Sequence, residues 1–334
     1  MNILATASSP LQLVNAAEAV QKLAPTSTNK HLVVRALKGS NNERVMRDVL
    51  ERQQWDSVYW YSSERKIVQL PALLYKYKGT HWDYVMGGDF TSWWYNSLLA
   101  NVTYGTHVLY DDGAKTVVDY ENCLTTGQLP QKKKGGKDLI LKLLGFKTMS
   151  FKFSPLVLFS IFNLPDTNHC SVIKNEMEWL RSQIGADVYA TDGAVLFIGQ
   201  PFIDTKAVQA DIYYSIVRNA LNSSESKKMI YTAHRGESFA VLEEIKKIGD
   251  IEVVSPLAPI ELELYRFSQR ISQIIGISST ALYTLKVLYK DIPTYRIELN
   301  DQDYIDLTFK KASETYHAFF GPYLPKFPGY PSDH

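Results

Sequence analysis

The stretch Tyr231-Thr232-Ala233-His234-Arg235-Gly236-Glu237-Ser238 organises the second half of this 334-residue chain. It follows an apolar run that is typical of a buried strand, and it precedes a segment with helical periodicity. The free N–H groups at the start of such a helix favour an anionic ligand, and Arg235 adds a fixed positive charge. Glu237 would repel a phosphate, so we expect it to order the turn. The alternative is a surface turn with a solvated His234.

Composition indicates a soluble globular protein that is long enough for two domains. Hydrophobic residues make up 45% of the chain and charged residues 21%, and the formal net charge of +1 indicates no nucleic-acid partner. The two cysteines, Cys123 and Cys170, form no metal-ligand pattern and fit a reducing cytosol. The chain starts without the features of a signal peptide and contains no apolar run of about 18 residues. We therefore expect a cytoplasmic protein.

Short apolar runs alternate with amphipathic runs in both halves of the chain. This pattern predicts an α/β fold with two similar domains, in which parallel sheets carry helices on both faces and the domains face a central cleft. The expected divisions are an N-terminal domain at 1–165, a linker at 166–190, a C-terminal domain at 191–300, a closing helix that returns to the N-terminal domain at 301–320, and a tail at 321–334.

Residues 114–170 interrupt the alternation with a basic and apolar segment. Lysines crowd an insert at about 130–152, beginning with Lys132, Lys133 and Lys134, and residues 151–162 are apolar and aromatic. A segment of this kind can lie on an anionic bilayer, which would place the protein peripherally on the inner face of the cytoplasmic membrane. The alternative is a solvated loop followed by a helix that packs inward.

Asp111-Asp112-Gly113 ends a predicted strand of the first domain. Ligands of open α/β sheets bind beyond the carboxyl ends of the strands, where a carboxylate can act as general base toward a hydroxyl group. The adjacent carboxylate is expected to raise the proton affinity of its neighbour. A plain Asp-Gly turn and a metal-binding pair of aspartates are the alternatives.

Ser278, Ser279 and Thr280 follow a predicted strand and open a predicted helix. Hydroxyl and N–H groups at a helix start can hold a phosphate, although an ordinary N-cap is the alternative. Glu261 can accept hydrogen bonds from a ribose diol, or it can simply complement a helix dipole. The chain has no Walker A loop, no Gly-x-Gly-x-x-Gly, no zinc-ligand spacing and no Gly-x-Ser-x-Gly elbow.

Together these motifs resemble those of the bacterial sialyltransferases of the two-domain GT-B type, above all the lipooligosaccharide and capsule sialyltransferases. Further landmarks of the resemblance are Ser9-Pro10-Leu11-Gln12-Leu13-Val14-Asn15-Ala16, Gly88-Asp89 and Gly199-Gln200-Pro201. The resemblance implies a GT-B fold, with an acceptor-side N-terminal domain and a nucleotide-sugar-binding C-terminal domain, both Rossmann-like. It also implies inverting transfer of sialic acid from CMP-sialic acid to a bacterial surface glycan, such as a galactose-terminated lipopolysaccharide, O-antigen repeat or capsule.

The resemblance assigns roles to the candidate residues. Asp112 would deprotonate the acceptor hydroxyl, and His234 would assist the departing phosphate. Arg235 stands where the family has a proline, which leaves open which residue of the turn meets the phosphate. Because CMP leaves with a single phosphate, we expect no metal and no cofactor besides the donor. The remaining expected donor ligands are Gly236, Glu261, Ser278, Ser279 and Thr280, and the expected acceptor or cleft residues are Gln12, Asn15, Asp89 and Asp111.

Two other functions compete with this interpretation. Thr232-Ala233-His234-Arg235 also resembles the His-Arg turn of the UDP-N-acetylglucosamine 2-epimerases, which share the two-domain architecture. Their second phosphate turn typically carries Ser-Gly-Gly, and Ser278-Ser279-Thr280 departs from it. The other alternative is a non-catalytic protein that binds a glycan or a membrane surface.

Overall fold

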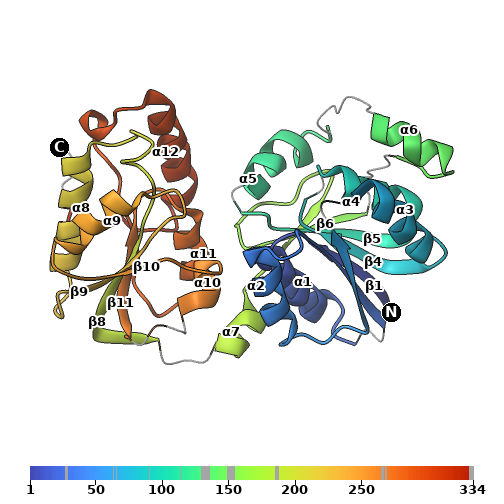
Figure 1. Ribbon diagram of the computed structural model, residues 1–334, viewed down its shortest axis with the longest axis horizontal. Helices are drawn as coiled ribbons and strands as arrows, with labels where there is room; N and C mark the ends of the chain where they lie inside the picture. Colours follow the sequence, from blue (N-terminus) through green and yellow to red (C-terminus); the bar gives the residue numbers. More distant parts are fainter. Residues whose placement is uncertain are drawn as a thin grey trace. The chain divides into compact units, whose positions relative to one another are not determined.

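The computed structural model describes residues 1–26, 29–62, 64, 66–89, 91–113, 115–128, 136–148, 155–184, 188–264, 267 and 269–330. The chain forms two compact units, Met1–Gln183 and Ile184–His334. Both are α/β units built on a parallel sheet (Figure 1). This confirms the predicted pair of Rossmann-like domains.

The first unit is built on a sheet whose described strands are all parallel and run in the order β3-β2-β1-β4-β5-β6-β7. The first six strands follow the order of a Rossmann sheet, whose switch point lies between β1 and β4. The strands are β1 (Asn2–Ala7), β2 (Asn29–Ala36), β3 (Ser57–Ser62), β4 (His81–Gly87), β5 (Thr103–Tyr110), β6 (Leu156–Ser160) and β7 (Ser171–Lys174).

Helices cover both faces of this sheet, with α1 and α2 on one face and α3 and α4 on the other (Figure 1). The helix α1 begins where predicted, because the Ser9 side chain accepts a hydrogen bond from Gln12 N and Pro10 fills the first turn. The helical segments are α1 (Pro10–Leu23), α2 (Asn41–Leu50), α3 (Lys66–Tyr77), α4 (Trp93–Asn101), α5 (Lys115–Asp119), the π-helical η1 (Tyr120–Leu124), α6 (Gly136–Leu143) and α7 (Glu178–Ile184).

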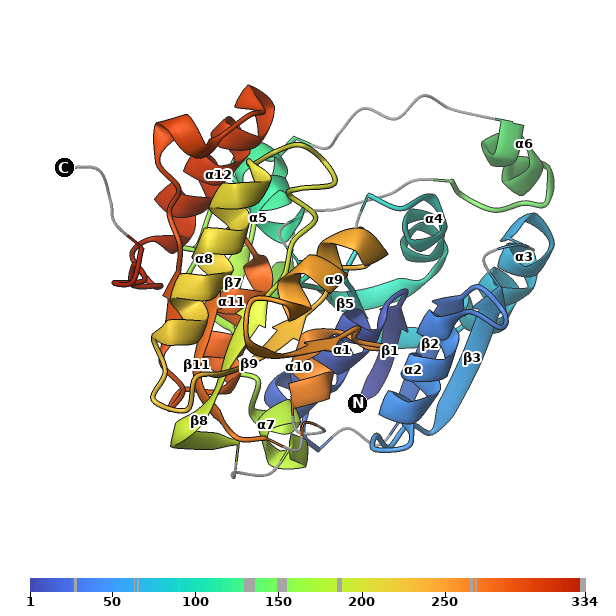
Figure 2. The same cartoon turned by 60° about the vertical axis from the view of Figure 1, so that its left-hand side comes forward.

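The second unit repeats the plan with the described strand order β10-β9-β8-β11-β12, again all parallel. Its switch point lies between β8 and β11, and α8 and α9 lie on the face opposite α11 (Figure 2). The elements are β8 (Tyr189–Ile198), α8 (Ala210–Asn222), β9 (Lys228–Thr232), α9 (Phe239–Lys246), β10 (Asp250–Val254), α10 (Ile260–Glu263), β11 (Ile271–Gly276), α11 (Thr280–Leu288), β12 (Thr294–Arg296), the 3-10 turn η3 (Asp301–Asp303) and α12 (Leu307–Phe320).

Each unit has its own hydrophobic core. In the first unit Leu4, Trp82 and Leu98 are fully or almost fully buried, and in the second unit Phe197 stacks on Tyr231 with ring centroids 5.5 Å apart. Burial of apolar surface is the main favourable term in folding, so each sheet is stabilised by its own helices. The strand ends that carry the candidate residues are thereby held in place.

The division between the units lies later than the sequence indicated. The stretch 166–190, expected to be a linker, contains β7, which pairs with β6 in the first sheet, and also α7. Residues 301–320, expected to return to the first domain, belong to the second unit, where rings of α12 and α11 contact each other. The tail also packs there, since Leu324 and Phe327 are buried.

The described part of the apolar segment at 151–162 does not present a surface to a membrane, which was one of the two interpretations of this region. Its described part contains β6, which pairs with β5, and Phe159, Ile161 and Phe162 are buried in the fold. Lys132, Lys133 and Lys134 lie outside the described residues. In the described part of the chain, no helix combines the length and the apolar character that crossing a membrane requires.

Candidate functional site

The carboxyl edge of the first sheet brings together Gln12, Asp89 and Asp112, which follow the adjacent strands β1, β4 and β5. Gln12 Nε2 donates to Asp112 Oδ1 at 2.7 Å, and Gln12 Oε1 accepts from Ser8 N at 2.8 Å. A Cβ atom at Gly88 would lie 2.8 Å from the Gln12 side chain, so glycine leaves the space that this glutamine occupies. The geometry assigns Gln12 a role that the sequence left open, which is to orient Asp112.

Asp112 is half-buried, and burial raises the pKa of its carboxyl above the usual range. The Gln12 hydrogen bond lowers that pKa and the charge of Asp89 raises it. The carboxylates whose charges raise this pKa are Asp89, from the neighbouring strand end, and Asp119 of α5, whereas we had expected the adjacent Asp111. Lys115 Nζ lies 3.7 Å from Asp89 Oδ1 and lowers the Asp112 pKa. A raised pKa is what a general base needs if it is to take a proton efficiently.

Asp111 is buried and hydrogen-bonded within the fold, although we expected it to face the cleft. It is 1% exposed, and its two carboxylate oxygens accept hydrogen bonds from Ser160 Oγ and Ile161 N, each at 2.6 Å. Burial raises its pKa to about 6. Asn15 is equally buried and joins Asp111 O to Asn175, which precedes α7. Asp111 thereby joins the end of β5 to the end of β6, and Asn15 joins it to α1 and to the segment after β7. Their expected place near the acceptor stays a prediction.

Residues that follow Asp112 complete this strand end, and the sequence did not single them out. Gly113 has a φ of +67°, a conformation that glycine adopts without strain. The backbone then turns so that Thr116 Oγ1 accepts from Asp112 N at 2.8 Å. A hydroxyl residue four positions after a strand-end aspartate is the only sequence signal for this contact. It fixes the backbone on which the Asp112 carboxylate is carried.

In the second unit, His234 lies in the turn between β9 and α9. Its Nδ1 atom accepts a hydrogen bond from Gly236 N at 3.1 Å, so the proton of the neutral ring resides on Nε2. Burial lowers the pKa of His234, and the charge of Arg235 lowers it further. The ring therefore stays neutral at pH 7 and offers one N–H donor. This arrangement suits a hydrogen bond to an anionic oxygen.

Glu237 orders this turn, as expected from the sequence. Its Oε2 atom accepts from His234 N at 2.6 Å, and its Oε1 atom accepts from the Tyr231 hydroxyl. A chain of hydrogen bonds continues through Tyr213 to Gln200 N, in the loop that follows β8. Burial raises the Glu237 pKa to about 7. The carboxyl group is thus engaged within the protein and is not directed at a phosphate.

The rest of the turn is open to solvent. Arg235 and Gly236 are exposed, and Arg235 forms no ion pair within the part of the chain that the structure describes. Ser238 caps α9 by accepting from Val241 N, and its own N–H group donates to Asp204 at 2.9 Å. A free guanidinium beside a helix start can recruit an anion. Asp204 was not singled out from the sequence.

Ser278, Ser279 and Thr280 lie at the carboxyl end of β11, where α11 begins. Ser278 Oγ is 2.9 Å from Ser313 Oγ, and Ser279 O accepts from the Tyr316 hydroxyl at 2.7 Å. Helix α12 therefore supports this turn, which the sequence did not reveal. Because β8 separates β9 from β11, the strand ends that precede the His234 and Ser278 turns lie about 10 Å apart in the sheet.

Glu261 lies in the short helix α10, which packs against α11. Its side chain is 6% exposed and hydrogen-bonds to Thr284 of α11, and burial raises its pKa. A ribose would have to compete with Thr284 for this carboxyl group. The expected role of Glu261 as a nucleotide ligand stays a prediction.

The described residues contain no evident site for cysteine-based or metal-based chemistry. Cys123 and Cys170 are both buried and unpaired, and burial raises the pKa of each thiol, which keeps it protonated. Among the residues that the structure describes, no three histidine, cysteine, aspartate or glutamate side chains are grouped to hold a metal ion. The expected independence of metals stays a prediction.

The comparison with protein families points to the second unit. Residues 163–296 match the model of the alpha-2,8-polysialyltransferase (POLYST) family. This stretch of the chain is similar to that family. The match covers less than half of the chain, and it includes all strands of the second sheet together with the turns of His234 and Ser278. Asp112 and the rest of its strand end lie outside the matched region. No protein in the curated set matches this chain.

Solved structures establish the fold. A UDP-GlcNAc 2-epimerase from Methanocaldococcus jannaschii is similar with a TM-score of 0.53 and 12% identity, covering 89% of this chain and 84% of that one. A putative UDP-N-acetylglucosamine 2-epimerase from Listeria monocytogenes has a TM-score of 0.52 and 14% identity, covering 90% and 79%. At such identities the likeness concerns the fold alone. The chain has the GT-B fold.

Proposed function

We propose that this protein transfers sialic acid from CMP-sialic acid to a hydroxyl group of a bacterial surface glycan, with inversion at the anomeric carbon. The observation that carries the proposal is the half-buried Asp112, which Gln12 orients and whose pKa is raised at the carboxyl edge of the first sheet. The family match over residues 163–296 supports a sialic acid donor bound by the second unit. A galactose-terminated lipopolysaccharide, O-antigen repeat or capsule is the proposed acceptor.

The proposed step is a single displacement. The acceptor oxygen forms a bond to the anomeric carbon of sialic acid while the bond from that carbon to the CMP phosphate oxygen breaks. Asp112 receives the proton of the acceptor hydroxyl, and CMP leaves with the bonding electrons. His234 donates a hydrogen bond from Nε2 to the departing phosphate, with Arg235 and the N–H groups of the Ser278 turn as further support. A monophosphate leaving group stabilised by such donors needs no metal ion.

The nucleotide preference separates this proposal from the epimerase alternative. A ligand that binds the folded state raises the unfolding temperature, by about 5 °C at roughly 100 times its Kd. We expect CMP to produce such a shift, and UDP to produce little or none at the same concentration. Differential scanning fluorimetry with both nucleotides measures this. Stabilisation by UDP with none by CMP would contradict the proposed donor and favour a UDP-sugar enzyme.

We also propose that α6 rests on an anionic membrane surface. Leu141 and the nearby Phe146 are buried, whereas Leu139 and Leu143 are 61% and 79% exposed, and Lys137 and Lys142 alternate with them. Helix α6 therefore packs against the protein through Leu141 and exposes Leu139 and Leu143 to solvent. Exposed apolar side chains among lysines are typical of a helix that lies in a membrane interface.

Vesicle flotation tests this contact. The unaltered protein is expected to float with vesicles that contain anionic lipid and to float less with neutral ones. The double change Leu139→Ser and Leu143→Ser should release it, because both side chains are exposed and their loss leaves the core intact. Val68→Ser, which alters another exposed apolar residue (77% exposed), serves as the matched control. Equal flotation of all three proteins, or none by the unaltered protein, would contradict the proposal.

A further inference from the structure

A cavity of about 320 Å³ lies in the first unit between α1, the loop after α2, and α7. Lys30 at the start of β2 and Trp55, two residues before β3, place it at the amino edge of the sheet. Asp112 follows the end of β5, at the opposite edge of the same parallel sheet. The cavity is therefore separate from the strand ends that carry the proposed reaction.

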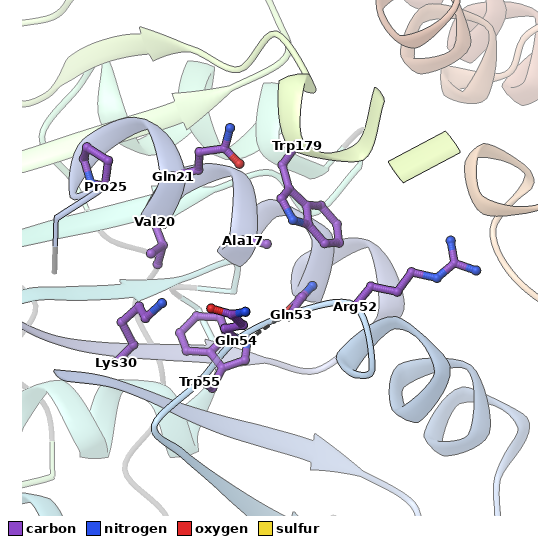
Figure 3. Close-up of a pocket in the computed structure, with 10 residues that line it drawn as sticks. All are labelled: Ala17, Val20, Gln21, Pro25, Lys30, Arg52, Gln53, Gln54, Trp55 and Trp179. Carbon is purple, nitrogen blue, oxygen red and sulfur yellow. Dashed lines mark hydrogen bonds between the residues drawn. The ribbon is translucent and has the colours of Figure 1, made fainter. Parts of the chain in front are cut away.

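Two tryptophans flank this cavity. Figure 3 shows Trp179 pointing from α7 toward the loop that carries Gln53, Gln54 and Trp55. Trp55 Nε1 donates to Gln53 Oε1 at 2.8 Å, and Gln53 Nε2 donates to Leu13 O at 3.2 Å, so the loop is fixed to α1. Both indoles are partly exposed, so each can still offer a ring face to a ligand.

The side of the cavity that Trp179 forms is also held in place by hydrogen bonds within the protein. Glu18 of α1 accepts hydrogen bonds from Trp179 N at 3.0 Å and from Leu180 N at 2.8 Å, which holds the first turn of α7 onto α1. Ala17 and Val20 of α1 supply small apolar side chains to the same cavity. A cavity that exists before the ligand arrives has little ordering cost on binding.

Polar groups in the cavity are left for a ligand. The Lys30 ammonium, the amides of Gln21 and Gln54, and Trp179 Nε1 form no hydrogen bond or ion pair within the residues that the structure describes. Ligand pockets typically combine apolar walls with a few polar groups of this kind. A pyranose ring suits these walls and polar groups, because its C–H face can lie on an indole while its hydroxyls form hydrogen bonds with the amides. Lys30 adds a partner for a carboxylate.

We propose that this cavity binds a carboxylate-bearing sugar residue of the glycan on which the protein acts, at a distance from the transferred group. The choice of a sialic acid residue as ligand rests on the proposed function. An accessory site of this kind would hold an extended anionic glycan on the first unit between successive encounters with the reacting edge.

The experiment measures binding of an α-methyl sialoside to the full chain by titration calorimetry, with a methyl galactoside as the neutral probe. Trp55→Ala and Trp179→Ala are expected to weaken sialoside binding about tenfold each, since each removes one stacking surface. Trp60→Ala, which removes a tryptophan outside the cavity, is the matched control. Lys30→Gln should weaken the sialoside but not the galactoside, whereas Lys22→Gln, which does not line the cavity, should change neither.

Thermal unfolding with and without CMP shows whether each variant is folded and keeps its nucleotide site. Sialoside binding that is unchanged in both tryptophan variants and in Lys30→Gln would overturn the inference, as would its absence in the unaltered protein. Lys30→Gln keeps the inference testable if a tryptophan variant does not fold. Absence of CMP stabilisation together with sialoside binding that depends on the cavity would instead contradict the proposed function alone.

Discussion

Replacing Asp112 by asparagine is expected to reduce sialic acid transfer by about 10²- to 10⁴-fold, the usual contribution of a general base. Asparagine can still accept the Gln12 hydrogen bond through Oδ1, so the strand end should keep its geometry. It cannot take a proton from the acceptor. Initial rates with CMP-sialic acid, together with CMP stabilisation of the same variant, provide the measurement. Turnover close to that of the unaltered protein would show that Asp112 is not the base.

Two neighbouring carboxylates serve as controls for this prediction. Asp111→Asn should lower the unfolding temperature, because its amide nitrogen would face the Ser160 hydroxyl or the Ile161 N–H group that now donates to a carboxylate. Asp89→Asn removes a negative charge that raises the Asp112 pKa. Without that charge Asp112 ionises at lower pH, so the acid limb of the kcat/KM profile should move to lower pH. A limb that stays in place would contradict the assignment of that limb to Asp112.

Replacing His234 by alanine is expected to reduce transfer by about 10²- to 10³-fold, which is typical for the loss of one donor that stabilises developing negative charge. The imidazole presents Nε2–H because Gly236 N donates to Nδ1, and alanine offers no such group. CMP should also bind more weakly. Steady-state kinetics and thermal shifts with CMP measure the two effects.

Two further substitutions separate the hydrogen bond of His234 from general positive charge. His234→Gln places an amide N–H group near the position of Nε2 and should recover part of the rate. Arg235→Ala removes an exposed charge, so its effect should be smaller and should shrink as salt rises. If His234→Ala retained both its rate and its CMP stabilisation, the leaving-group role would belong to another residue of the turn.

Much of the fold could be predicted from the periodicity of the sequence. The Ser9-Pro10 start of α1, the strand that ends before Asp111, and the β9–turn–α9 unit around His234 all have strong local signals. The strands β6 and β7 were missed because they are short, at five and four residues, and follow a stretch of sequence that breaks the alternation of apolar and amphipathic runs. Their pairing in the first sheet moved the domain boundary from residue 165 to Gln183.

The candidate site was predictable only as far as local motifs extend. Asp111 and Asp112 are adjacent in the sequence, yet Ser160 and Ile161 bury the first and Gln12 orients the second. That difference depends on β6 and α1, which reach the end of β5 from distant parts of the chain. Two other features also depend on contacts between distant segments, which leave no local signal in the sequence. These are the support of the Ser278 turn by α12 and the cavity between α1 and Trp179.

The most direct test of the central claim is incubation of the unaltered protein with CMP-sialic acid and a panel of galactosides and sialosides, in the presence of EDTA, with the products identified by mass. We expect one acceptor to gain a sialic acid residue while CMP is released, and the new linkage to have the inverted anomeric configuration. No product from any acceptor, together with conversion of UDP-N-acetylglucosamine into its 2-epimer by the same preparation, would contradict the account.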